Sequence, residues 1–539
     1  MKKVYVSILA AAIPAIGLAQ SAVDAYTLGS NEMRGTARFM SMGGAFTALG
    51  GDLSSLNQNP AGIGVYRSSE VGATLDINFQ STKTDPAFDG FRSKESQTKA
   101  YCNNFGYVGT AYLGGAMPTF SWGVTYNRTA SFDRLYSGYN PSTDVSLSDY
   151  IAAYTTNDGV KYTDMDFASD YNPYLDSGID WLSTLAYNSW MINPTGLTSY
   201  QGLSGNGTVG DALFNVRERG YIDEYNISFG GNVENIVNWG ISFGITDLDY
   251  TRLTYYSESM ENALIPNATA EQPRGNAGFE MSNYKHISGS GWNIKAGVIV
   301  KPINEFRIGF AVHTPTWYRL DQSYEASVDY SYLNPALAED RNNPLSGSKN
   351  TENAFRPWRL NSPWKLMFGA AAVIGSQAIV SIDYEYDAYG SMKTKTPRFD
   401  SYGYISSFES NDYLNDDISN YFKGSSMIRL GVEYRVTPQF SLRAGYNYRT
   451  TNVKNDAYDN NIEIFTSGTD PSYTFDKDMY AISFGLGYKY KSWYIDAAYV
   501  YRHRESKFSA FTSYGEFNAP SWKVQDNNSS LVLSTGFKF

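Results

Sequence analysis

The sequence has 539 residues, of which 42% are hydrophobic and 16% aromatic, enough to bury a large core. It contains only one long apolar run, near its start, which excludes a polytopic helical membrane protein because each spanning helix needs about 20 mostly apolar residues. The 43 Lys and Arg against 54 Asp and Glu give a formal charge of -11, so the chain lacks a basic surface and we expect no nucleic acid as a partner. The 48 Gly and 45 Tyr favour strands and turns, and we expect an all-β protein.

The first residues are typical of an export signal. Lys2 and Lys3 precede a short apolar stretch that ends at Leu18, and Ala19 supplies a small residue at the position that a signal peptidase requires. We therefore predict a signal peptide over residues 1–19, cleavage before Gln20, and export of the mature chain from the cytoplasm.

Strict alternation of apolar and polar residues is the dominant pattern of the remaining chain. It runs from Met427 to Val436 and restarts at Phe440, after Thr437 and Pro438. A period of two is typical of a strand with one apolar and one polar face. Counted along the chain, the pattern predicts strands over 70–80, 100–113, 119–131, 220–233, 237–256, 290–302, 304–328, 363–375, 377–394, 424–437, 439–453, 478–490, 492–508 and 528–539.

These strands fit a membrane barrel better than a soluble sandwich. Many are about ten residues long or longer and carry Trp near their ends, and their number is even, as in bacterial outer-membrane barrels. Their connections are alternately short and long, which is typical of periplasmic turns and extracellular loops. The chain ends on Phe539, a common final residue of such barrels, through which we expect recognition by the barrel-assembly machinery. We predict a 14-stranded antiparallel transmembrane β-barrel over residues 69–539, surrounded by outer-membrane lipids and lipopolysaccharide of a Gram-negative bacterium.

A segment rich in small residues lies between the signal peptide and the first strand. It runs from Arg34 to Asp52 through Gly43-Gly44-Ala45, and it leads to Asn59-Pro60-Ala61-Gly62. This segment resembles the N-terminal hatch, or plug, of the FadL/TodX/OmpP1 family of outer-membrane transporters for hydrophobic compounds. Similarity to that family extends over essentially the whole mature chain, and includes the segments 364–386, 431–434 and 442–448. The loop after the third strand is longer than the family leads us to expect.

The resemblance implies a barrel closed by a hatch over residues 20–68, with a hydrophobic small molecule bound inside and released sideways through a gap beside a kinked strand. The hatch would be fixed by the motif Asn59, Pro60, Ala61 and Gly62. The resemblance also makes Val23, Tyr26 and Leu28, near the mature N-terminus, candidates for the ligand site. The kinked strand would be the third, where Gly123 permits a bulge and is the lateral-gate candidate; an ordinary lumen-facing glycine is the alternative.

The long loop after the third strand contains a short stretch with helical spacing. Apolar residues between Ile179 and Met191 recur every three or four positions. Trp181, Leu182 and Trp190 are therefore candidates for a hydrophobic capture groove at the barrel mouth; the alternative is that they pack the loop onto itself. The loop is also rich in aspartate, but it lacks the Gly and closing Glu of a calcium loop, so we expect a solvated acidic surface and no metal.

The remaining sequence motifs do not indicate a catalytic, metal or cofactor site. The stretch Gly240–Gly244 matches a nucleophile elbow around Ser242, but it lies within strand alternation where that motif needs a sharp turn. His286, His313 and His503 are widely spaced, and Cys102 is the single cysteine, so we expect no cofactor. Lumen-facing arginines, namely Arg429, Arg435, Arg443 and Arg449, predict a cross-strand ionic ladder, and one of them is suited to bind a carboxylate head group.

We interpret the sequence as a passive importer of long-chain fatty acids or other hydrophobic small molecules, with no enzymatic activity. An importer predicts an apolar pocket that is continuous with a lateral gap. Three alternatives remain: a secretion-system shuttle or adaptor built on the same barrel, an outer-membrane lipase with a Ser–His pair, and a haem-related receptor. The adaptor predicts a lumen plugged by loops and an exposed apolar patch at the rim.

Overall fold

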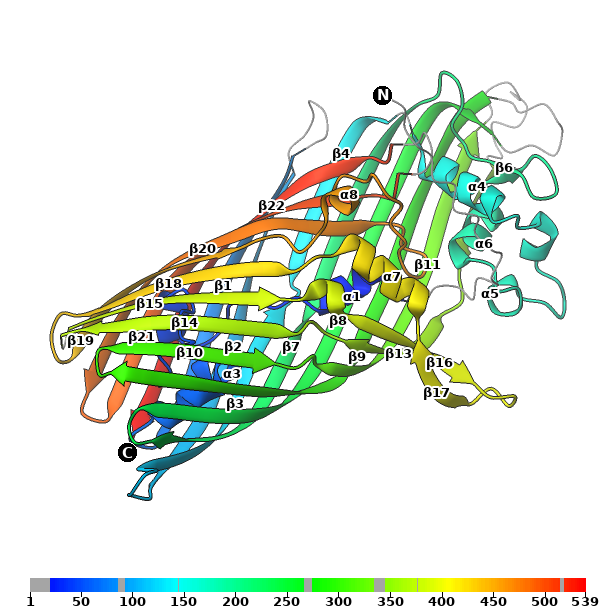
Figure 1. Cartoon of the computed structure of the whole chain (residues 1–539). Coiled ribbons are helices and arrows are strands. Elements are labelled where there is room, and N and C mark those ends of the chain that lie inside the picture. The colour runs from blue at the N-terminus through cyan, green and yellow to red at the C-terminus, as the bar shows by residue number, and fades with distance from the viewer. Residues whose placement is uncertain are drawn as a thin grey trace, which may run out of the picture.

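The computed structural model describes residues 20–85, 93–143, 145–265, 274–333, 345–375, 377–513 and 518–539; the predicted signal peptide lies outside these ranges. Within them one antiparallel sheet curls into a closed barrel (Figure 1). The barrel closes where the last strand, β22 (Ser521–Lys538), pairs with the first, β1 (Glu70–Asp85), over the full length of β1.

The wall of the described barrel contains 14 strands when successive pieces of one strand are counted together, which confirms the predicted fold class. Between β1 and β22 these are β2 (Ser93–Tyr112), β3 (Thr119–Ser131) continued by β4 (Arg134–Thr143), β7 (Val209–Val233), β8 (Val237–Leu264), β9 (Arg274–Ile303), β10 (Phe306–His313) continued by β11 (Trp317–Leu333), the pieces β12 (Leu345–Asn350), β13 (Ala354–Asn361) and β14 (Lys365–Ile374), then β15 (Ala378–Asp387), β18 (Ser425–Arg435), β19 (Phe440–Arg449), β20 (Tyr473–Tyr490) and β21 (Trp493–Ser509).

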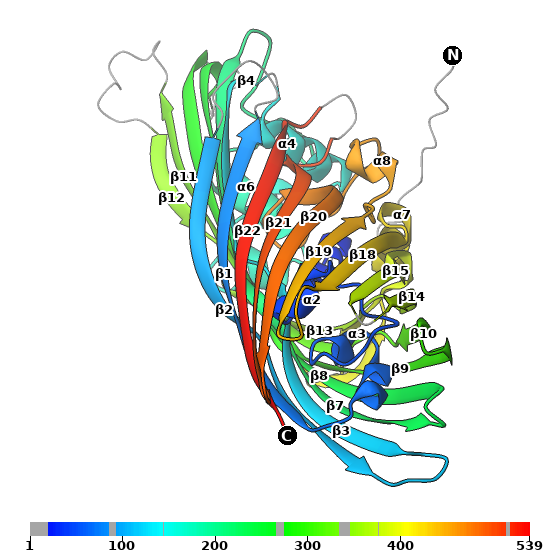
Figure 2. The ribbon, with the colours of Figure 1, turned by 90° about the vertical axis from the view of Figure 1, so that its left-hand side faces the viewer.

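Helices occur in the N-terminal segment and in the extracellular loops. The N-terminal segment, which lies inside the barrel, contains α1 (Ala22–Leu28), α2 (Ala37–Ser41), α3 (Ser55–Gln58) and the 3-10 helix η1 (Pro60–Val65) (Figure 2). The loop elements are α4 (Leu147–Asn157), η2 (Tyr162–Met165), α5 (Pro173–Asp176), α6 (Trp181–Asn188), the pair β5 (Asn193–Pro194) and β6 (Tyr200–Gln201), η4 (Tyr389–Ser391), β16 (Lys393–Phe399), β17 (Ile405–Ser410), α7 (Asp412–Tyr421) and α8 (Asn455–Tyr458). No helix in the described ranges is long and apolar enough to cross a membrane.

The barrel presents apolar side chains outward and polar side chains inward. On β18, for example, Ile428, Leu430 and Val432 are 44%, 42% and 43% exposed, whereas Arg429 and Glu433 are buried in the lumen. This arrangement is the reverse of a soluble protein, and it suits a wall whose outer face contacts lipid.

The predicted strands are right in number and order, but their extracellular ends are misplaced. Most are predicted too short, whereas β15 and β19 end at Asp387 and Arg449 where alternation predicts residues 394 and 453. β7 begins at Val209 where alternation predicts residue 220, and β9 begins at Arg274 where it predicts residue 290. Beyond the bilayer the pattern inverts, because inward-facing residues such as Phe214 of β7 and Met281 of β9 are buried in an apolar cluster with loop residues, while the outward face no longer contacts lipid. The third strand also continues as β4, which shortens the loop that follows it.

The barrel wall is much taller on one side than on the other. β7, β8 and β9 have 25, 28 and 30 residues, whereas β15, β18 and β19 have 10, 11 and 10. On the short side the wall is continued by η4 and α7, and α1 packs against α7 from within. The hairpin β16–β17 leaves the barrel at the same level and projects away from it (Figure 1).

Candidate functional site

Asn59 joins the centre of the hatch to the wall. Its Nδ2 donates to the Thr47 carbonyl at 2.6 Å and to the Phe310 carbonyl of β10 at 3.4 Å, and its Oδ1 accepts from the Ala61 N–H at 3.0 Å. Pro60 takes the first position of η1, where its fixed φ suits a helix and its missing N–H leaves no bond unmade. The motif therefore fixes the hatch through hydrogen bonds of Asn59 to backbone groups.

Gly62 completes the motif by allowing two hatch segments to touch. Its Cα lies against Gly50, and its carbonyl accepts from the Gly51 N–H at 3.2 Å. A side chain at this position would separate the two segments, so glycine is required here for a close approach.

The hatch backbone rests on glycines of the inner wall. A Cβ added to Gly240 of β8 would lie 2.7 Å from the Ala61 nitrogen and closer still to the Pro60 carbonyl, and one added to Gly297 of β9 would lie 2.9 Å from the Asn59 Cγ. We call the set the glycine seat; its other members are Gly309 of β10, Gly431 of β18 and Gly445 of β19, which contact hatch residues 42–48. Its only signal in the sequence is glycine at a lumen-facing position of an alternating strand.

A buried ion pair anchors the start of the hatch. Ser21 and Asp24 form a capping box at the N-terminus of α1, and the Asp24 carboxylate also pairs with Lys285 Nζ of β9 at 2.7 Å and accepts from the Ser467 hydroxyl at 2.5 Å. Asp24 and Lys285 are both buried. Because a buried charge is costly without its partner, this pair ties α1 firmly to the wall.

The three N-terminal ligand candidates lie together on α1. Val23, Tyr26 and Leu28 are all buried, and the Tyr26 ring stacks on Phe422 at 5.0 Å and meets the edge of Phe475 at 5.7 Å. Val23 and Tyr26 line a cavity of about 100 Å³, which we call the upper cavity, and Leu28 lines a second cavity of about 130 Å³. Glu32 and Arg34 border both, so the hatch chain lies between them.

The upper cavity is polar, unlike the apolar pocket that an importer predicts, whereas the second cavity has a mixed polar and apolar lining. The upper cavity is bordered by six cationic side chains, namely Arg34, Arg134, Arg252, Arg449, Lys477 and Arg504, and by four carboxylates, Glu32, Asp133, Glu218 and Asp476. The physical reason is that the inner face of the wall carries the polar half of every alternating strand, and the hatch adds further charges instead of covering them.

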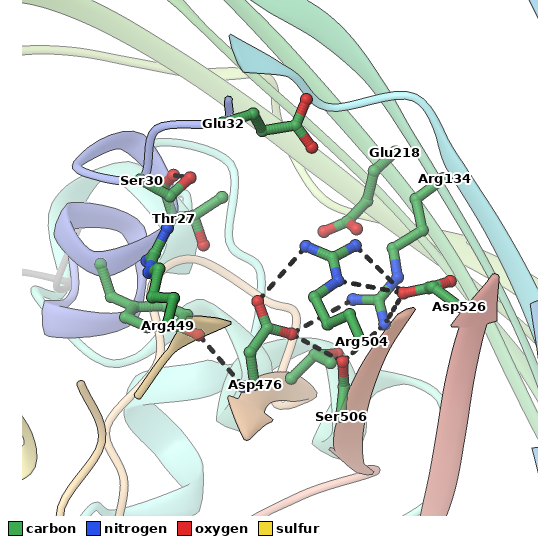
Figure 3. A network of polar contacts seen from close by, with 12 residues as sticks. Thr27, Ser30, Glu32, Arg134, Glu218, Arg449, Asp476, Arg504, Ser506 and Asp526 are labelled. Carbon is green, nitrogen blue, oxygen red and sulfur yellow. Dashed lines mark hydrogen bonds and ion pairs between the residues drawn. The ribbon is translucent and has the colours of Figure 1, made fainter. Parts of the chain in front are cut away.

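Most of these charges are paired with one another across four strands (Figure 3). Arg504 of β21 bonds Asp476 of β20 at 3.3 Å and Asp526 of β22 at 3.0 Å, and Arg134 of β4 bonds the same Asp526 at 2.6 Å. The network ties the start of β4 to β20, β21 and β22.

Arg449 is different, because no ion pair joins it to a carboxylate of the described chain. Its guanidinium donates to the Asn31 carbonyl at 2.9 Å and to the Tyr389 hydroxyl at 3.1 Å, and it borders the upper cavity. The predicted ladder is confirmed for Arg429, which pairs with Glu385, and for Arg443, which pairs with Glu433 at 2.7 Å and Asp496 at 2.6 Å. Arg435 is exposed and takes no part in it.

Gly123 lies within an unbroken ladder, opposite Val108 of β2 and Ser228 of β7. The bulge predicted there lies instead between Arg128 and Ala130, nearer the extracellular end of the strand. The inner face of Gly123 is taken up by the hatch, since a Cβ there would lie 3.5 Å from Ile63. Gly123 is thus a lumen-facing glycine of regular backbone.

The wall is interrupted just beyond that bulge. The ladder between β2 and β3 ends at Asn104 opposite Asn127, and in the described chain neither β2 above that point nor β4 has a strand bonded to its facing edge. Instead the inner face of β2 overlaps the outer face of β4: Ser93 and Ser137 hydroxyls lie 2.6 Å apart, and Tyr101 donates to Asp133 at 2.8 Å. We call this the β2–β4 gap.

The candidates in the long loop are not brought to α1. Trp181 and Leu182 of α6 are buried, and Trp181 packs edge-on against Tyr174 and Tyr324, both at 5.3 Å, while its Nε1 donates to the Tyr174 carbonyl. These two residues therefore hold the loop together. Trp190 alone of the three is exposed, at 43%.

The serine and histidines singled out in the sequence lie apart from one another in the structure. Ser242 lies in β8 with its hydroxyl 2.9 Å from that of Ser228, in regular strand. His286 bonds Asp249, His313 bonds the Gln58 carbonyl and His503 bonds Asn527, so each is held separately. Within the described residues, no group of three or more His, Cys, Asp or Glu side chains is placed to hold a metal ion.

Two carboxyl groups in the extracellular loops have raised pKa values. Burial, together with the nearby carboxylates of Asp158 and Asp417, raises the pKa of Glu463 to about 7. Burial likewise raises the pKa of Asp417, on α7, to about 6, with a contribution from Asp416. Three loops that are distant in sequence thus bring like charges together above the barrel.

Comparison with known proteins places this architecture in a family. The family model described as outer membrane protein transport protein (OMPP1/FadL/TodX) matches residues 198–539, more than half of the chain. The structure is similar to that of a Pseudomonas aeruginosa FadL homologue, with 13% identity, a TM-score of 0.52, and coverage of 94% of this chain and 99% of that chain.

Lower similarity extends to two toluene transporters. Pseudomonas putida TodX shows 13% identity, a TM-score of 0.45 and coverage of 94% and 99%, and Ralstonia pickettii TbuX shows 12% identity, a TM-score of 0.42 and coverage of 94% and 98%. A search of curated proteins finds no match. On the family match, the chain belongs to the OMPP1/FadL/TodX family of outer-membrane transport proteins, and it is a β-barrel of a Gram-negative outer membrane.

Proposed function

We propose that the protein imports amphiphilic hydrophobic molecules, with long-chain fatty acids as the leading class, and releases them sideways into the membrane without chemical conversion. One observation carries this proposal: the upper cavity, beside α1, reaches the segment 130–134 that forms the inner edge of the β2–β4 gap. A site next to a break in the wall lets an acyl chain pass from the lumen to lipid without crossing water, which saves roughly 0.8 kcal/mol for each methylene kept out of water.

The charges of the upper cavity favour a ligand with an anionic head over a plain hydrocarbon. Cationic groups outnumber carboxylates along its border, and Arg449 is the one among them that no carboxylate of the described chain pairs. A guanidinium can hold a carboxylate by two parallel hydrogen bonds. Arg449 is therefore the group to which we assign the ligand head, with the acyl chain directed toward α1 and the gap.

Two binding measurements test this assignment. Wild-type protein and Arg449→Gln are titrated with a long-chain fatty acid and with the alcohol of the same chain length. Loss of a charge-assisted contact costs about 1.5–3 kcal/mol, so the variant should bind the acid about 10- to 150-fold more weakly and the alcohol unchanged. Equal binding of the acid by both proteins would show that the head group lies elsewhere.

A cross-link tests the exit route. In a Cys102→Ser background, cysteines at positions 93 and 137 would bridge the β2–β4 gap, because the side chains of Ser93 and Ser137 touch. The matched control places cysteines at Thr110 and Ser121, whose hydroxyls lie 3.0 Å apart within the continuous β2–β3 ladder. Oxidation should slow uptake in the first variant, reversibly with a reductant, and leave the control unaffected. Slowing in both variants, or in neither, would contradict lateral exit at this gap.

A further inference from the structure

Three cations lie side by side on the outer surface of the barrel. Arg319 of β11 is directly opposite Arg359 of β13, and Arg359 is directly opposite Lys395 of β16. Side chains in such a register are about 5 Å apart at Cβ, and like charges placed there destabilise a sheet. The arrangement therefore requires a compensating negative charge.

All three side chains face away from the lumen. Their neighbours in sequence, Leu360 and Thr394 among them, are buried on the inner side, and alternation places Arg319, Arg359 and Lys395 outside. Arg319 and Lys395 are exposed, and Arg359 is half-buried because its guanidinium lies over the Phe408 ring at 3.8 Å. Lys393, also exposed, lies two residues before Lys395 on the same face of β16.

The row lies just beyond an outward-facing pair of tryptophans, which we take as part of the extracellular aromatic belt. Trp317 of β11 faces outward and packs against Trp292 at 4.3 Å, and Arg319 follows two residues later toward the extracellular end. Two residues of strand advance by about 7 Å, which is the step from the belt to the head-group level of the outer leaflet. On the same side, Figure 1 shows the hairpin β16–β17 projecting outward over this level.

No carboxylate of the described chain forms an ion pair with the row. Asp321, two residues beyond Arg319 on the same face of β11, acts electrostatically on Arg359, but this one carboxylate leaves a net positive charge on the three cations. Glu409 of β17 is engaged by Arg398 at 2.6 Å. Among the residues that the structure describes, the guanidinium of Arg359 donates to one acceptor, the carbonyl of its neighbour Trp358.

We propose that Arg319, Arg359 and Lys395 form a binding site for the phosphate groups of the outer-leaflet glycolipid, lipid A. Two guanidinium groups supply planar, paired donors to phosphate oxygens, and Lys395 adds a third charge at the edge. The phosphate removes the repulsion within the row, and the acyl chains of the same lipid lie against the apolar wall below Trp317. The site is separate from the lumen and does not depend on what the barrel transports.

The test compares two triple variants of the full-length protein purified from outer membranes. Arg319→Gln/Arg359→Gln/Lys395→Gln removes the row, and Arg435→Gln/Lys489→Gln/Lys491→Gln removes three exposed cations at the periplasmic end, so both lose the same charge. Delipidated proteins are titrated with diphosphorylated lipid A, with dephosphorylated lipid A and with inorganic phosphate. Each basic residue near a lipid surface contributes about 1 kcal/mol, so the first variant should bind diphosphorylated lipid A about 100-fold more weakly, and the second as tightly as wild type.

Three results would overturn the proposal. Equal weakening in both triple variants would show an effect of net charge alone. Equal binding of dephosphorylated lipid A would show that acyl chains suffice, and binding of inorganic phosphate as tight as that of lipid A would show a soluble-anion site. The variant Arg319→Lys/Arg359→Lys keeps the charges and loses the planar donors, so it should bind diphosphorylated lipid A more weakly than wild type and more tightly than the triple glutamine variant. Binding as weak as that of the triple glutamine variant, in a folded barrel, would also contradict the assignment.

Discussion

Replacing Gly240 by alanine should loosen the hatch without touching a hatch residue. The new Cβ would lie 2.7 Å from the Ala61 nitrogen and closer to the Pro60 carbonyl. These are backbone atoms, so no side chain can rotate away, and the hatch must retreat by about 1 Å to regain contact distances near 3.5 Å. Overpacking of this kind costs about 1–3 kcal/mol, which raises the unseated fraction of the hatch about 5- to 150-fold.

The assay is ion leak through single barrels in a planar bilayer. Gly240→Ala should open more often than wild type, while unfolding of the barrel in detergent stays unchanged, since the wall ladder is preserved. Gly278→Ala on β9 is the matched control, because its Cβ would lie 3.5 Å from the Glu258 carbonyl, an ordinary contact. Equal leak in the two variants, or a Gly240→Ala barrel as closed as wild type, would refute the close approach of hatch and wall.

Three further predictions concern the hatch and the loops. Asn59→Ala leaves the Thr47 carbonyl and the Ala61 N–H without their partner, so the free energy that holds the hatch against the wall should fall by about 1–3 kcal/mol. The ion leak should lie between that of wild type and that of a hatch deletion, and a leak equal to wild type would contradict this. Lys285→Met leaves the buried Asp24 carboxylate without its partner, so the attachment of α1 to the wall should weaken by about 3–5 kcal/mol and a protease should cleave near α1. The double variant Lys285→Met/Asp24→Asn removes the unpaired charge and should be cleaved less. In the folded state the pKa of Glu463 is about 7, against an ordinary value of 4.5, so the stability of the loop should fall as the pH rises from 4.5 to 7. Hydrogen exchange of residues 450–472 measures this stability, and Glu463→Gln should remove most of its pH dependence. A pH dependence that the variant leaves unchanged would argue against burial of this carboxyl.

Strand alternation predicts the barrel because lipid and lumen impose opposite demands on adjacent residues of β18 or β19. The extracellular ends were misplaced because the demands on the two faces change there: the inner face packs on the loop core and the outer face leaves the lipid. The hatch motif could be placed by resemblance, but the glycine seat could not: a lumen-facing glycine such as Gly297 has the same appearance in sequence whether it borders water or a second backbone.

The position of the wall break depends on tertiary contacts that no local pattern contains. A glycine at position 123 permits a bulge, yet the irregularity occurs at Arg128–Ala130, where Arg128 pairs with Asp223 at 2.8 Å and lies over the Tyr221 ring at 4.9 Å. Likewise the spacing that marks α6 as amphipathic does not tell which side of it meets the loop core, and Trp181 lies on the buried side.

The glycine seat has a consequence for how the barrel is assembled. A strand that pairs one residue out of register turns every side chain to the opposite face, so a slipped β8 would present Trp239 or Ile241 to the hatch at the place of Gly240. The backbone around Pro60 has no room for either. The hatch can therefore close only a barrel whose strands are correctly aligned.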